Sequence, residues 1–375
     1  MITVMHVVKA YRGNYPLLNN IVNNQSKDTK TIVCYLTGKD DGNNKISEFV
    51  DNAYYLNAEN LSLFNFSIPI KLKKIIEEEG VNIVCSHLEK VIYLSVLTSF
   101  IVKTKIKLVG VIHGLVGKNE NPDFRKIKNF IFFKKLNAII AVSKSIREDV
   151  LRENYRIPES KVYAVQNGLI YDAFLADITK SDARKSILPQ CNYSLWFGTV
   201  GRLVEKKNHK NLIMAFKGFL EKFPDSALLI VGGGGLESTL KEMVKSFGIE
   251  EKVFFLGVRN DIPKILKTLD LFVFPTYREG LPLSLLEAMA SEIPVIGSNI
   301  GCIREVFEDC DMGILIDPNS IDSIENAMEH MANLPEEARR LLGANARMRA
   351  LNNFTAEKMA HEYQNIFEKV YREGC

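Results

Sequence analysis

The sequence predicts an α/β protein with two domains, each built around a parallel β-sheet that is covered by helices. Its 375 residues are too many for one ordinary core and suit two domains of ordinary size. Short β-branched runs alternate along the chain with amphipathic stretches of helical length, which is typical of parallel α/β layers. The alternation pauses once, over the polar residues 172–190, and then begins again, so we expect the domain boundary near this pause.

In the first half, five runs have the length and composition of buried strands. These runs are Ile2–Val8, Thr31–Leu36, Val81–Cys85, Lys107–Ile112 and Ala138–Val142. Amphipathic stretches between them predict helices over Pro69–Glu79, Leu88–Phe100 and Asp123–Lys135. A further short run, Val162–Val165, leads into an Asn167-Gly168 turn, after which the pattern pauses.

The second half repeats the same pattern. Its expected strands are Leu195–Val200, Ala227–Val231, Val253–Leu256, Leu271–Phe274, Pro294–Ile296 and Gly313–Ile316. Its expected helices are Lys210–Lys222, Leu236–Ser246, Leu283–Met289, Ser323–Asn333, Pro335–Asn352 and Ala356–Tyr371. We therefore predict a first domain over residues 1–170, a second over 171–355, and a last helix within 356–375. Ligands bind at the carboxyl ends of the strands in open parallel sheets, so the loops that follow the strands are the places to search.

The composition is that of a soluble globular protein, with 46% apolar and 25% charged residues. The six cysteines are scattered without a CxxC pair, which predicts reduced thiols in a cytoplasmic location. The chain opens on an expected strand and not on a signal peptide. The longest nearly apolar run, Val91–Val102, is far shorter than the ~20 residues of a membrane-spanning helix. Any contact with a membrane is therefore expected to be peripheral, on its cytoplasmic face.

The charge is divided unevenly between the two halves. Residues 1–170 contain 24 Lys and Arg against 16 Asp and Glu, whereas residues 171–375 contain 24 against 29. A basic half favours an anionic surface or an acidic acceptor. The stretch 124–136 interleaves basic and aromatic residues, so it predicts either a helix that lies on an anionic membrane or a helix that packs its aromatic side chains on the sheet. No nucleic-acid motif accompanies the charge, so we expect no nucleic-acid partner.

The most informative stretch is residues 270–294, where a buried strand should end at Pro275 and a helix should begin near Pro282. The loop and the first turn of this helix offer backbone N–H groups from Gly280, Leu281, Leu283 and Ser284. Such donors, together with the helix dipole, suit a diphosphate. Glu279 and Glu287 would be repelled by an anion, so they are expected to accept hydrogen bonds from sugar and ribose hydroxyls. The alternative is a helix whose first turns are simply rich in glutamate.

A second informative stretch, residues 200–208, follows a strand and leads into a helix near Asn208. Arg202 can bind a phosphate through two hydrogen bonds, and Lys207 adds a compact positive charge five residues later. The alternative is an exposed basic turn without a ligand.

Taken in order, these segments resemble one large family. The matching pieces are V-Q-N-G (165–168), V-G-R-L and K-N-H (200–209), L-I-V-G-G-G (229–234), F-F-L-G (254–257), the run L-F-V-F-P-T-Y-R-E-G-L-P-L-S-L-L-E-A-M-A (271–290), P-V-I (294–296), G-I-L-I (313–316) and F-T (354–355). With these pieces the chain resembles the GT-B glycosyltransferases of the retaining family 4, also called glycosyltransferase group 1. The first half is similar more loosely, through His113-Gly114 and A-V-S (141–143).

The resemblance implies a fold of two Rossmann-like domains that face each other across a cleft, with the C-terminal helix crossing back to the first domain. It implies that Arg202 and Lys207 neutralise the diphosphate of a nucleotide-sugar donor. It also implies that Glu279 holds hydroxyls of the transferred sugar and that Glu287 holds the ribose. The amides of Gly280, Leu281 and Leu283 would contact the sugar or a phosphate.

The resemblance extends to four further residues. Val258 and Arg259 would form the platform for the base, and His113 would reach the donor sugar or diphosphate. Gly13 would allow the backbone to approach the phosphates. Many family members have paired glycines there, whereas this chain reads Ala10-Tyr11-Arg12-Gly13-Asn14-Tyr15.

The activity implied is retaining transfer of a hexose or N-acetylhexosamine from a UDP-sugar to a glycan or lipid-linked acceptor, in the synthesis of a bacterial surface polysaccharide or lipopolysaccharide. No cofactor and no metal are expected. The DxD-like Asp309-Cys310-Asp311 is a common chance triplet, and Glu237 stands where a nicotinamide-binding turn needs its third glycine. A GT-B sugar-nucleotide epimerase and a scaffold that binds a nucleotide or glycan without turnover remain as alternatives.

Overall fold

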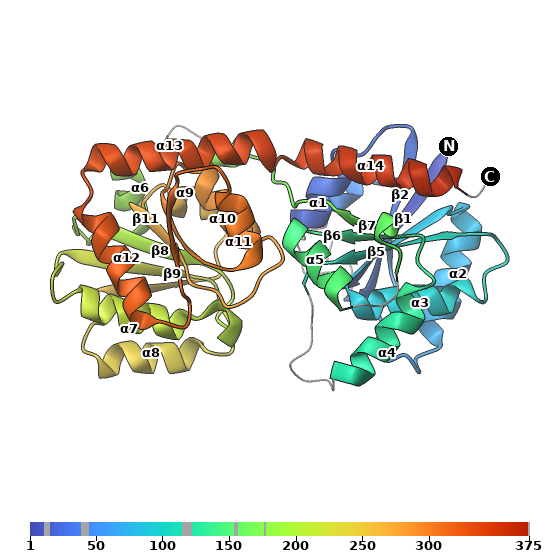
Figure 1. Cartoon of the computed structure of the whole chain (residues 1–375), viewed down its shortest axis with the longest axis horizontal. Helices are drawn as coiled ribbons and strands as arrows, with labels where there is room; N and C mark the ends of the chain where they lie inside the picture. Colours follow the sequence, from blue (N-terminus) through green and yellow to red (C-terminus); the bar gives the residue numbers. More distant parts are fainter. Residues whose placement is uncertain (11–15, 39–44, 115–121, 154–156, 176–177, 374–375) are drawn as a thin grey trace. The chain divides into compact units, whose positions relative to one another are not determined.

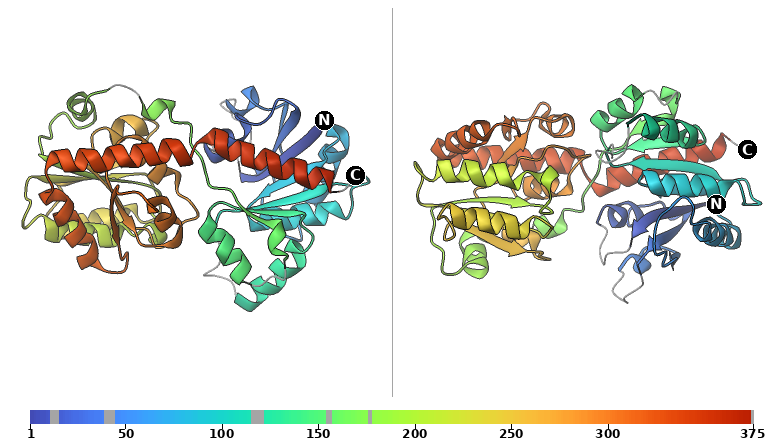
Figure 2. Two further views of the ribbon diagram at one scale, coloured as in Figure 1. Left: turned by 45° about the horizontal axis from the view of Figure 1, so that its top comes forward. Right: turned by 90° about the horizontal axis from the view of Figure 1, so that it is seen from below.

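The structure is a computed structural model, and it describes residues 1–10, 16–38, 45–114, 122–153, 157–175 and 178–373. The chain forms two compact units, the first made of Met1–Gly168 with Ala356–Cys375 and the second of Leu169–Thr355. The first crossing point, between Gly168 and Leu169, lies two residues before the expected end of the first domain. In each unit, helices cover a sheet on both of its faces (Figures 1 and 2).

The first unit contains a seven-stranded parallel sheet with the order β3-β2-β1-β4-β5-β6-β7. Its strands are β1 (Ile2–Ala10), β2 (Thr29–Thr37), β3 (Asn52–Tyr55), β4 (Ile83–His87), β5 (Lys107–Ile112), β6 (Ala138–Ala141) and β7 (Val162–Ala164). Its helices are α1 (Pro16–Val22), α2 (Ser67–Glu79), α3 (Glu89–Ser99), α4 (Pro122–Phe133), α5 (Lys144–Arg152) and α14 (Ala356–Arg372). The sequence did not predict β3, α1 or α5.

The second unit contains a six-stranded parallel sheet with the order β10-β9-β8-β11-β12-β13. Its strands are β8 (Leu195–Val200), β9 (Ser226–Val231), β10 (Val253–Gly257), β11 (Leu271–Phe274), β12 (Val295–Ser298) and β13 (Gly313–Ile316). Its helices are α6 (Lys180–Ile187), α7 (His209–Phe219), α8 (Glu237–Ser246), α9 (Ile262–Leu266), α10 (Leu283–Ala290), α11 (Gly301–Phe307), α12 (Ile321–Asn333) and α13 (Glu336–Asn353).

Successive side chains of a strand point to opposite faces of the sheet. In the second sheet the side chains on both faces are apolar, as is usual for a parallel sheet covered by helices on both sides. Trp196, Leu229 and Phe272 join one buried cluster with α10 and α13. Phe197 and Leu228, their chain neighbours, join the other cluster with α7 and α12. This explains why the strands read as continuous apolar runs in the sequence.

The strand orders identify where a ligand can bind. In each sheet the first strand lies beside the fourth, which makes a switch point between β1 and β4 and another between β8 and β11. Connections leave a switch point in opposite directions, so a crevice opens at the carboxyl ends of the two strands. In the second unit, Phe197 pairs with Leu271 and Gly198 with Phe272. This register brings the loop after β8 next to the loop after β11.

The last helix, α14, is part of the first unit, although in the sequence the whole second unit lies between α14 and the rest of the first unit. The ring of Phe367 lies edge-on against His6 of β1, with ring centroids 5.9 Å apart. Met359 Sδ accepts the backbone N–H of Gly168, and Gln364 accepts the hydroxyl of Thr29. Within the described ranges, none of the helices combines the length and apolar character needed to cross a membrane.

Candidate functional site

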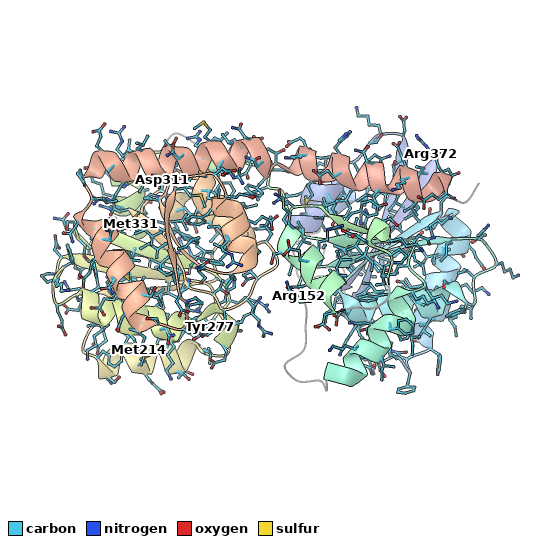
Figure 3. All side chains as sticks on the ribbon, viewed as in Figure 1. Arg152, Met214, Tyr277, Asp311, Met331 and Arg372 are labelled. Atoms are coloured by element: carbon cyan, nitrogen blue, oxygen red, sulfur yellow. The ribbon has the colours of Figure 1, made fainter. Side chains whose placement is uncertain are left out.

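The two loops at the switch point of the second unit are tied together by hydrogen bonds. The carbonyl of Lys206, after β8, accepts the N–H of Tyr277 at 2.9 Å and the hydroxyl of Thr276 at 2.8 Å. Asn208 donates to the carbonyls of Pro275 and Pro318 while its own backbone is left-handed, with φ 58°. Asparagine adopts this conformation more readily than most residues. Tyr277 is labelled in Figure 3.

A carboxylate and two lysines meet between these loops. Glu279 Oε1 lies 2.9 Å from Lys207 Nζ, and Glu279 Oε2 lies 3.4 Å from Lys206 Nζ. The Thr276 hydroxyl, whose proton has the Lys206 carbonyl at 2.8 Å, also lies 3.2 Å from Glu279 Oε1. The Lys207 amine also sits 4.5 Å from the centroid of the Phe274 ring, a cation–π contact. The structure therefore places two of the predicted residues, Lys207 and Glu279, in direct contact.

Burial lowers the pKa of Lys207, and the charges of Lys206 and Arg202 act in the same direction, whereas Glu279 opposes them. Lys207 is thus a largely buried cation whose position is fixed by its surroundings. Arg202 differs, because its side chain is exposed and has no hydrogen bond or ion pair within the described ranges. The loop after β8 therefore offers one fixed and one free cation for an anion.

Glycines bring the loop after β9 against the loop after β8. A Cβ at Gly232 would lie 2.0 Å from the carbonyl oxygen of Gly201, and one at Gly234 would lie 2.4 Å from that of Leu203. Gly232 also has φ +130°, which side chains rarely adopt. A Cβ at Gly201 would come within 3.3 Å of Lys207 Cε, so this glycine leaves room for the buried lysine. The expected tight turn thus also supports the cationic loop.

The helix α10 begins where the sequence predicted a diphosphate site. Pro282 precedes it and supplies no side-chain cap. The N–H groups of Leu283 and Ser284 precede the helical hydrogen bonds, whereas that of Leu285 donates to the Pro282 carbonyl at 3.2 Å. Gly280 and Leu281 lie just before this turn, as expected. α10 thus presents backbone donors and the positive end of its dipole beside the cations.

Glu287, in the second turn of α10, has a carboxylate with no hydrogen bond or ion pair in the described part of the chain. Burial raises its pKa to about 7. A half-buried carboxylate that no described group satisfies is an available acceptor for ligand hydroxyls. The sequence indicated the residue, but only the structure shows that no group of the described residues satisfies it.

The two residues expected to face the base lie after β10. The side chain of Val258 is 81% exposed. Arg259 makes two short contacts to Asp261, from Nε at 2.8 Å and from Nη2 at 2.6 Å. This bidentate pair holds the guanidinium plane in one orientation. A Cβ at Gly233 would lie 3.1 Å from Val258, so the glycine loop is the neighbour of this platform.

Two predicted residues do not belong to this set. Gly13 lies outside the described residues. His113 follows β5 in the first unit, where its Nε2 lies 3.4 Å from His87 Nδ1. Conversely, sequence reasoning missed the contacts that Lys206 and Thr276 make with Glu279. In the sequence, these two residues were marked only by their positions: Lys206 is the neighbour of Lys207, and Thr276 lies just before Glu279.

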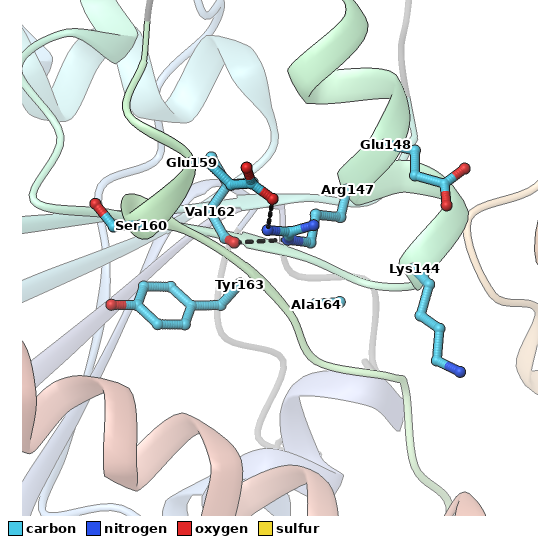
Figure 4. A pocket seen from close by; sticks show the side chains of 8 residues that line it. All are labelled: Lys144, Arg147, Glu148, Glu159, Ser160, Val162, Tyr163 and Ala164. Atoms are coloured by element: carbon cyan, nitrogen blue, oxygen red, sulfur yellow. Dashed lines mark hydrogen bonds and ion pairs between the residues drawn. The ribbon is translucent and has the colours of Figure 1, made fainter.

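Two other places in the structure bear on alternative sites: a cluster of possible metal ligands and a hollow in the first unit. Among the described residues, the group of three potential metal ligands whose ligand atoms all lie within 4.8 Å of one another is that of His6, Cys85 and His87. A hollow of about 550 Å³ lies beside α5 and β7 in the first unit (Figure 4). An ion pair of Arg147 with Glu159 crosses this hollow, and none of the predicted site residues lines it.

Comparisons with known proteins agree with the geometry. Residues 193–349 match the family model of glycosyl transferases group 1, and residues 29–172 match that of glycosyltransferase family 4. The UDP-Gal:alpha-D-GlcNAc-diphosphoundecaprenol alpha-1,3-galactosyltransferase of Escherichia coli is 30% identical over 311 residues, covering 80% of this chain and 78% of that protein. The N-acetyl-alpha-D-glucosaminyl L-malate synthase of Bacillus anthracis is 25% identical, covering 83% and 80%.

Solved structures share the fold. A glycosyltransferase from Rickettsia africae superposes with a TM-score of 0.83 at 21% identity, over 100% of this chain and 99% of the other. HepE of Anabaena, in complex with UDP and glucose, gives 0.83 at 17% identity, over 98% and 100%. Together with the switch-point loops and the match to both family models, these similarities show that the chain belongs to glycosyltransferase family 4, the group 1 glycosyltransferases, and has their GT-B fold.

Proposed function

We propose that this protein is a retaining, metal-independent glycosyltransferase that moves a hexose or N-acetylhexosamine from a UDP-sugar to a hydroxyl of a glycan or lipid-linked acceptor. The observation that carries the proposal is the juxtaposition, at the switch point of the second unit, of the Lys207–Glu279 pair with the helix start of α10. These groups match the two parts of such a donor, an anionic diphosphate and a sugar rich in hydroxyls.

Cleavage of the sugar–phosphate bond leaves negative charge on UDP. Lys207 and Arg202, with the amides of Gly280, Leu281 and Leu283, would stabilise that charge, because they are oriented before the reaction starts. One donor of this kind typically contributes on the order of 3 kcal/mol to a transition state. Fixed cations can thus supply the charge that a divalent ion supplies in other enzymes. We therefore expect the rate of sugar transfer to be unchanged when EDTA removes divalent metal ions.

The two glutamates differ in their ion pairing, and this difference suits them to different groups of the ligand. Glu279 is ion-paired with both lysines, so its oxygens are held in place to accept sugar hydroxyls. Glu287 has no partner among the described residues, and ribose hydroxyls would satisfy it. Uridine would lie against Val258 and Arg259. A uridine donor is supported by the Escherichia coli relative, named for UDP-Gal, and by the HepE complex with UDP.

For the chemical step we propose attack from the face that UDP leaves. The bond from the anomeric carbon to the phosphate oxygen breaks, and the acceptor oxygen forms its bond on the same side, so the configuration is retained. The acceptor proton passes to a phosphate oxygen of the departing UDP. The ion pairs of Glu279 with two lysines support this route, because they weaken its carboxylate as a covalent nucleophile.

We also propose peripheral contact with an anionic membrane through α4, in the synthesis of a bacterial surface polysaccharide or lipopolysaccharide. Ile127 and Ile131, one turn apart on α4, are 57% and 56% exposed, whereas Phe133 is buried. The exposed ring of Phe100 lies beside Lys135, 5.4 Å from its amine. Apolar side chains next to lysines suit the interface of an anionic bilayer. The lipid-linked substrate in the name of the Escherichia coli relative supports this reading.

The test is a panel of UDP-sugars and diphosphoundecaprenol-linked acceptors, with the product configuration read by NMR. We expect transfer with retention and, without acceptor, slow hydrolysis. Epimerisation of the donor without acceptor would replace the transferase reading, and UDP binding without any turnover would reduce the protein to a scaffold. Arg202→Ala and Lys207→Ala should lose activity while they remain folded. Lys210→Ala removes an exposed lysine at the start of α7 and serves as the charge-matched control.

A further inference from the structure

Asn208 links three loops that follow strands of the second sheet. Its amide nitrogen donates to the carbonyl of Pro275, after β11, at 3.1 Å and to the carbonyl of Pro318, after β13, at 2.7 Å. Its own backbone ends the loop after β8 and leads into α7. The side chain is buried, with 3% of its surface exposed. Both protons of the amide are therefore used, each on a different loop.

The backbone of Asn208 restricts which residue can make this link. Its φ of 58° and ψ of 34° are left-handed, a conformation that glycine adopts freely and that asparagine and aspartate tolerate. Glycine has no side chain, and an aspartate carboxylate has no proton to donate. Of these three residues, asparagine is thus the one that both suits the backbone and binds two carbonyls.

The hydrogen bonds of Asn208 act next to the backbone of Lys207, its chain neighbour. The Pro275 carbonyl comes directly after Phe274, whose ring centroid lies 4.5 Å from the Lys207 amine. Glu279, whose Oε1 lies 2.9 Å from the same amine, is in the loop that follows Pro275. Both groups that hold the amine therefore belong to the chain segment that Asn208 ties to the loop after β8.

Asn211, in the first turn of α7, reinforces this link. Its amide nitrogen lies 3.1 Å from the Pro318 carbonyl and 3.2 Å from the Tyr277 hydroxyl. The backbone N–H of Tyr277 in turn donates to the Lys206 carbonyl at 2.9 Å. The loops after β8, β11 and β13 are thus connected in a closed ring of hydrogen bonds, with Asn208 in two of them.

We infer that Asn208 is a positioning residue for sugar transfer, which holds Lys207 and Glu279 at the separation that lets one face the diphosphate and the other the sugar. The inference rests on the proposed function for the identity of these ligand groups. Because Asn208 is buried and both of its amide protons are used, it acts through Lys207 and not on the donor directly. A misplacement of about 1 Å in such a group can lower a rate about 100-fold.

The test is a double-mutant cycle in the full-length protein, read by calorimetry of UDP binding and by kcat/KM of transfer. Asn208→Gly keeps the left-handed backbone and removes both hydrogen bonds, so we expect it to fold, which its melting temperature checks. It should weaken UDP binding roughly 10-fold and lower kcat/KM by up to about 100-fold. In the Lys207→Met background, the same change should weaken UDP binding by less than about 2-fold, because the residue through which it acts is gone.

Three results would overturn the inference. UDP binding by Asn208→Gly that equals that of the wild type would leave a role for the backbone alone. An equal loss in the wild-type and Lys207→Met backgrounds would show that Asn208 does not act through Lys207. The matched control is Asn345→Ala, which removes an amide-to-carbonyl hydrogen bond of 2.8 Å to Asp311, before β13. It should bind UDP like the wild type, and an equal loss in this control would reduce Asn208 to a general contribution to stability.

Hydrogen exchange of the Tyr277 backbone N–H gives a second readout that needs no ligand. This N–H donates to the Lys206 carbonyl, so it exchanges when the two loops separate. Asn208→Gly should raise its exchange rate roughly 10-fold, and Asn345→Ala should leave it unchanged. An unchanged rate in Asn208→Gly would overturn the inference. If the wild type does not bind UDP, the proposed function fails, whereas the exchange rates still decide whether Asn208 holds the loops together.

A second variant covers the case in which Asn208→Gly does not fold. Asn211→Ala removes the contacts with the Pro318 carbonyl and the Tyr277 hydroxyl from a helical residue, where alanine is favourable. It should weaken UDP binding and raise the Tyr277 exchange rate, each by about 3-fold, the cost of one ordinary hydrogen bond. No effect on either measurement would count against the ring of hydrogen bonds and would overturn the inference.

Discussion

The two sheets share one strand order around their switch points, yet the groups at those points differ in kind. In the second unit the point is occupied by charges: Glu279 lies between Lys206 and Lys207, and Arg202 makes no ion pair with any residue that the structure describes. In the first unit it is occupied by the neutral rings of His6, His87 and His113. The same topology can therefore supply either a charge-compensating or a charge-free set of hydrogen bonds. The difference is decided by burial and by the neighbours of each side chain.

The largest expected effect comes from removing the fixed cation. Lys207→Met should lower kcat/KM of sugar transfer by about 100- to 1,000-fold, the cost of losing one oriented charge donor on the order of 3 kcal/mol. It should also weaken UDP binding, measured by calorimetry. The Lys210→Ala control should behave like the wild type. Equal rates in Lys207→Met and the wild type would show that the crevice does not stabilise the diphosphate.

The next effect concerns Glu287 and pH. Its pKa in the folded protein, about 7, is higher than its ordinary value of 4.5. The protonated form is therefore favoured by folding, and this contribution is complete below pH 4.5 and is lost as pH rises to 7. Glu287→Gln removes the dependence. Between pH 5 and 8, urea unfolding of the wild type should lose about 2–3 kcal/mol relative to the variant. If the free energies of unfolding of the wild type and the variant changed in parallel between pH 5 and 8, the result would contradict the raised pKa of Glu287.

The same residue offers a sharper test of the donor site. If ribose hydroxyls bind the ionised carboxylate, UDP binding near pH 7 should drive a proton from Glu287 into the solvent. Calorimetry in buffers with different ionisation enthalpies measures this release directly. The Glu287→Gln variant should show none. Release that is unchanged in the variant would assign the proton to another group.

The smallest expected effect lies on the surface of the first unit. Replacing Ile131 on α4 and Lys135, two residues beyond the end of α4, by glutamate should weaken binding to anionic liposomes by several-fold, since each basic residue contributes about 1 kcal/mol near such a surface. The rate on a soluble acceptor should not change. Liposome binding that does not depend on anionic lipid would argue for the packed-helix alternative.

The sequence predicted most strands because buried parallel strands are continuous apolar runs. It missed β3 because the Asn52–Tyr55 strand is short, lies at the sheet edge and is only partly buried. It missed α11, Gly301–Phe307, because two turns are too short for a clear helical period. The chain leaves the first unit after Gly168 and returns to it at Ala356, and in the sequence a turn and a polar stretch mark the first of these two points.

For the site, the sequence could indicate residue types but not their partners. It placed Lys207 near Glu279 through two separate loops, whose contact follows from the strand order. It could not show that Glu287 lacks a partner among the residues that the structure describes, because such an absence depends on everything packed around it. The sequence also could not predict that His6, His87 and His113 lie in a row. His6 and His87 are 81 residues apart, and nothing in the sequence links them.

The return of α14 to the first unit has a consequence for synthesis of the chain. Met359, Tyr363 and Phe367 are buried, so part of the first unit remains uncovered until the last residues have been made. The ribosome completes the whole of residues 169–355 during that interval. Exposed apolar surface of this kind invites aggregation and chaperone binding. A premature stop after α13 would thus harm the half of the protein that was translated first.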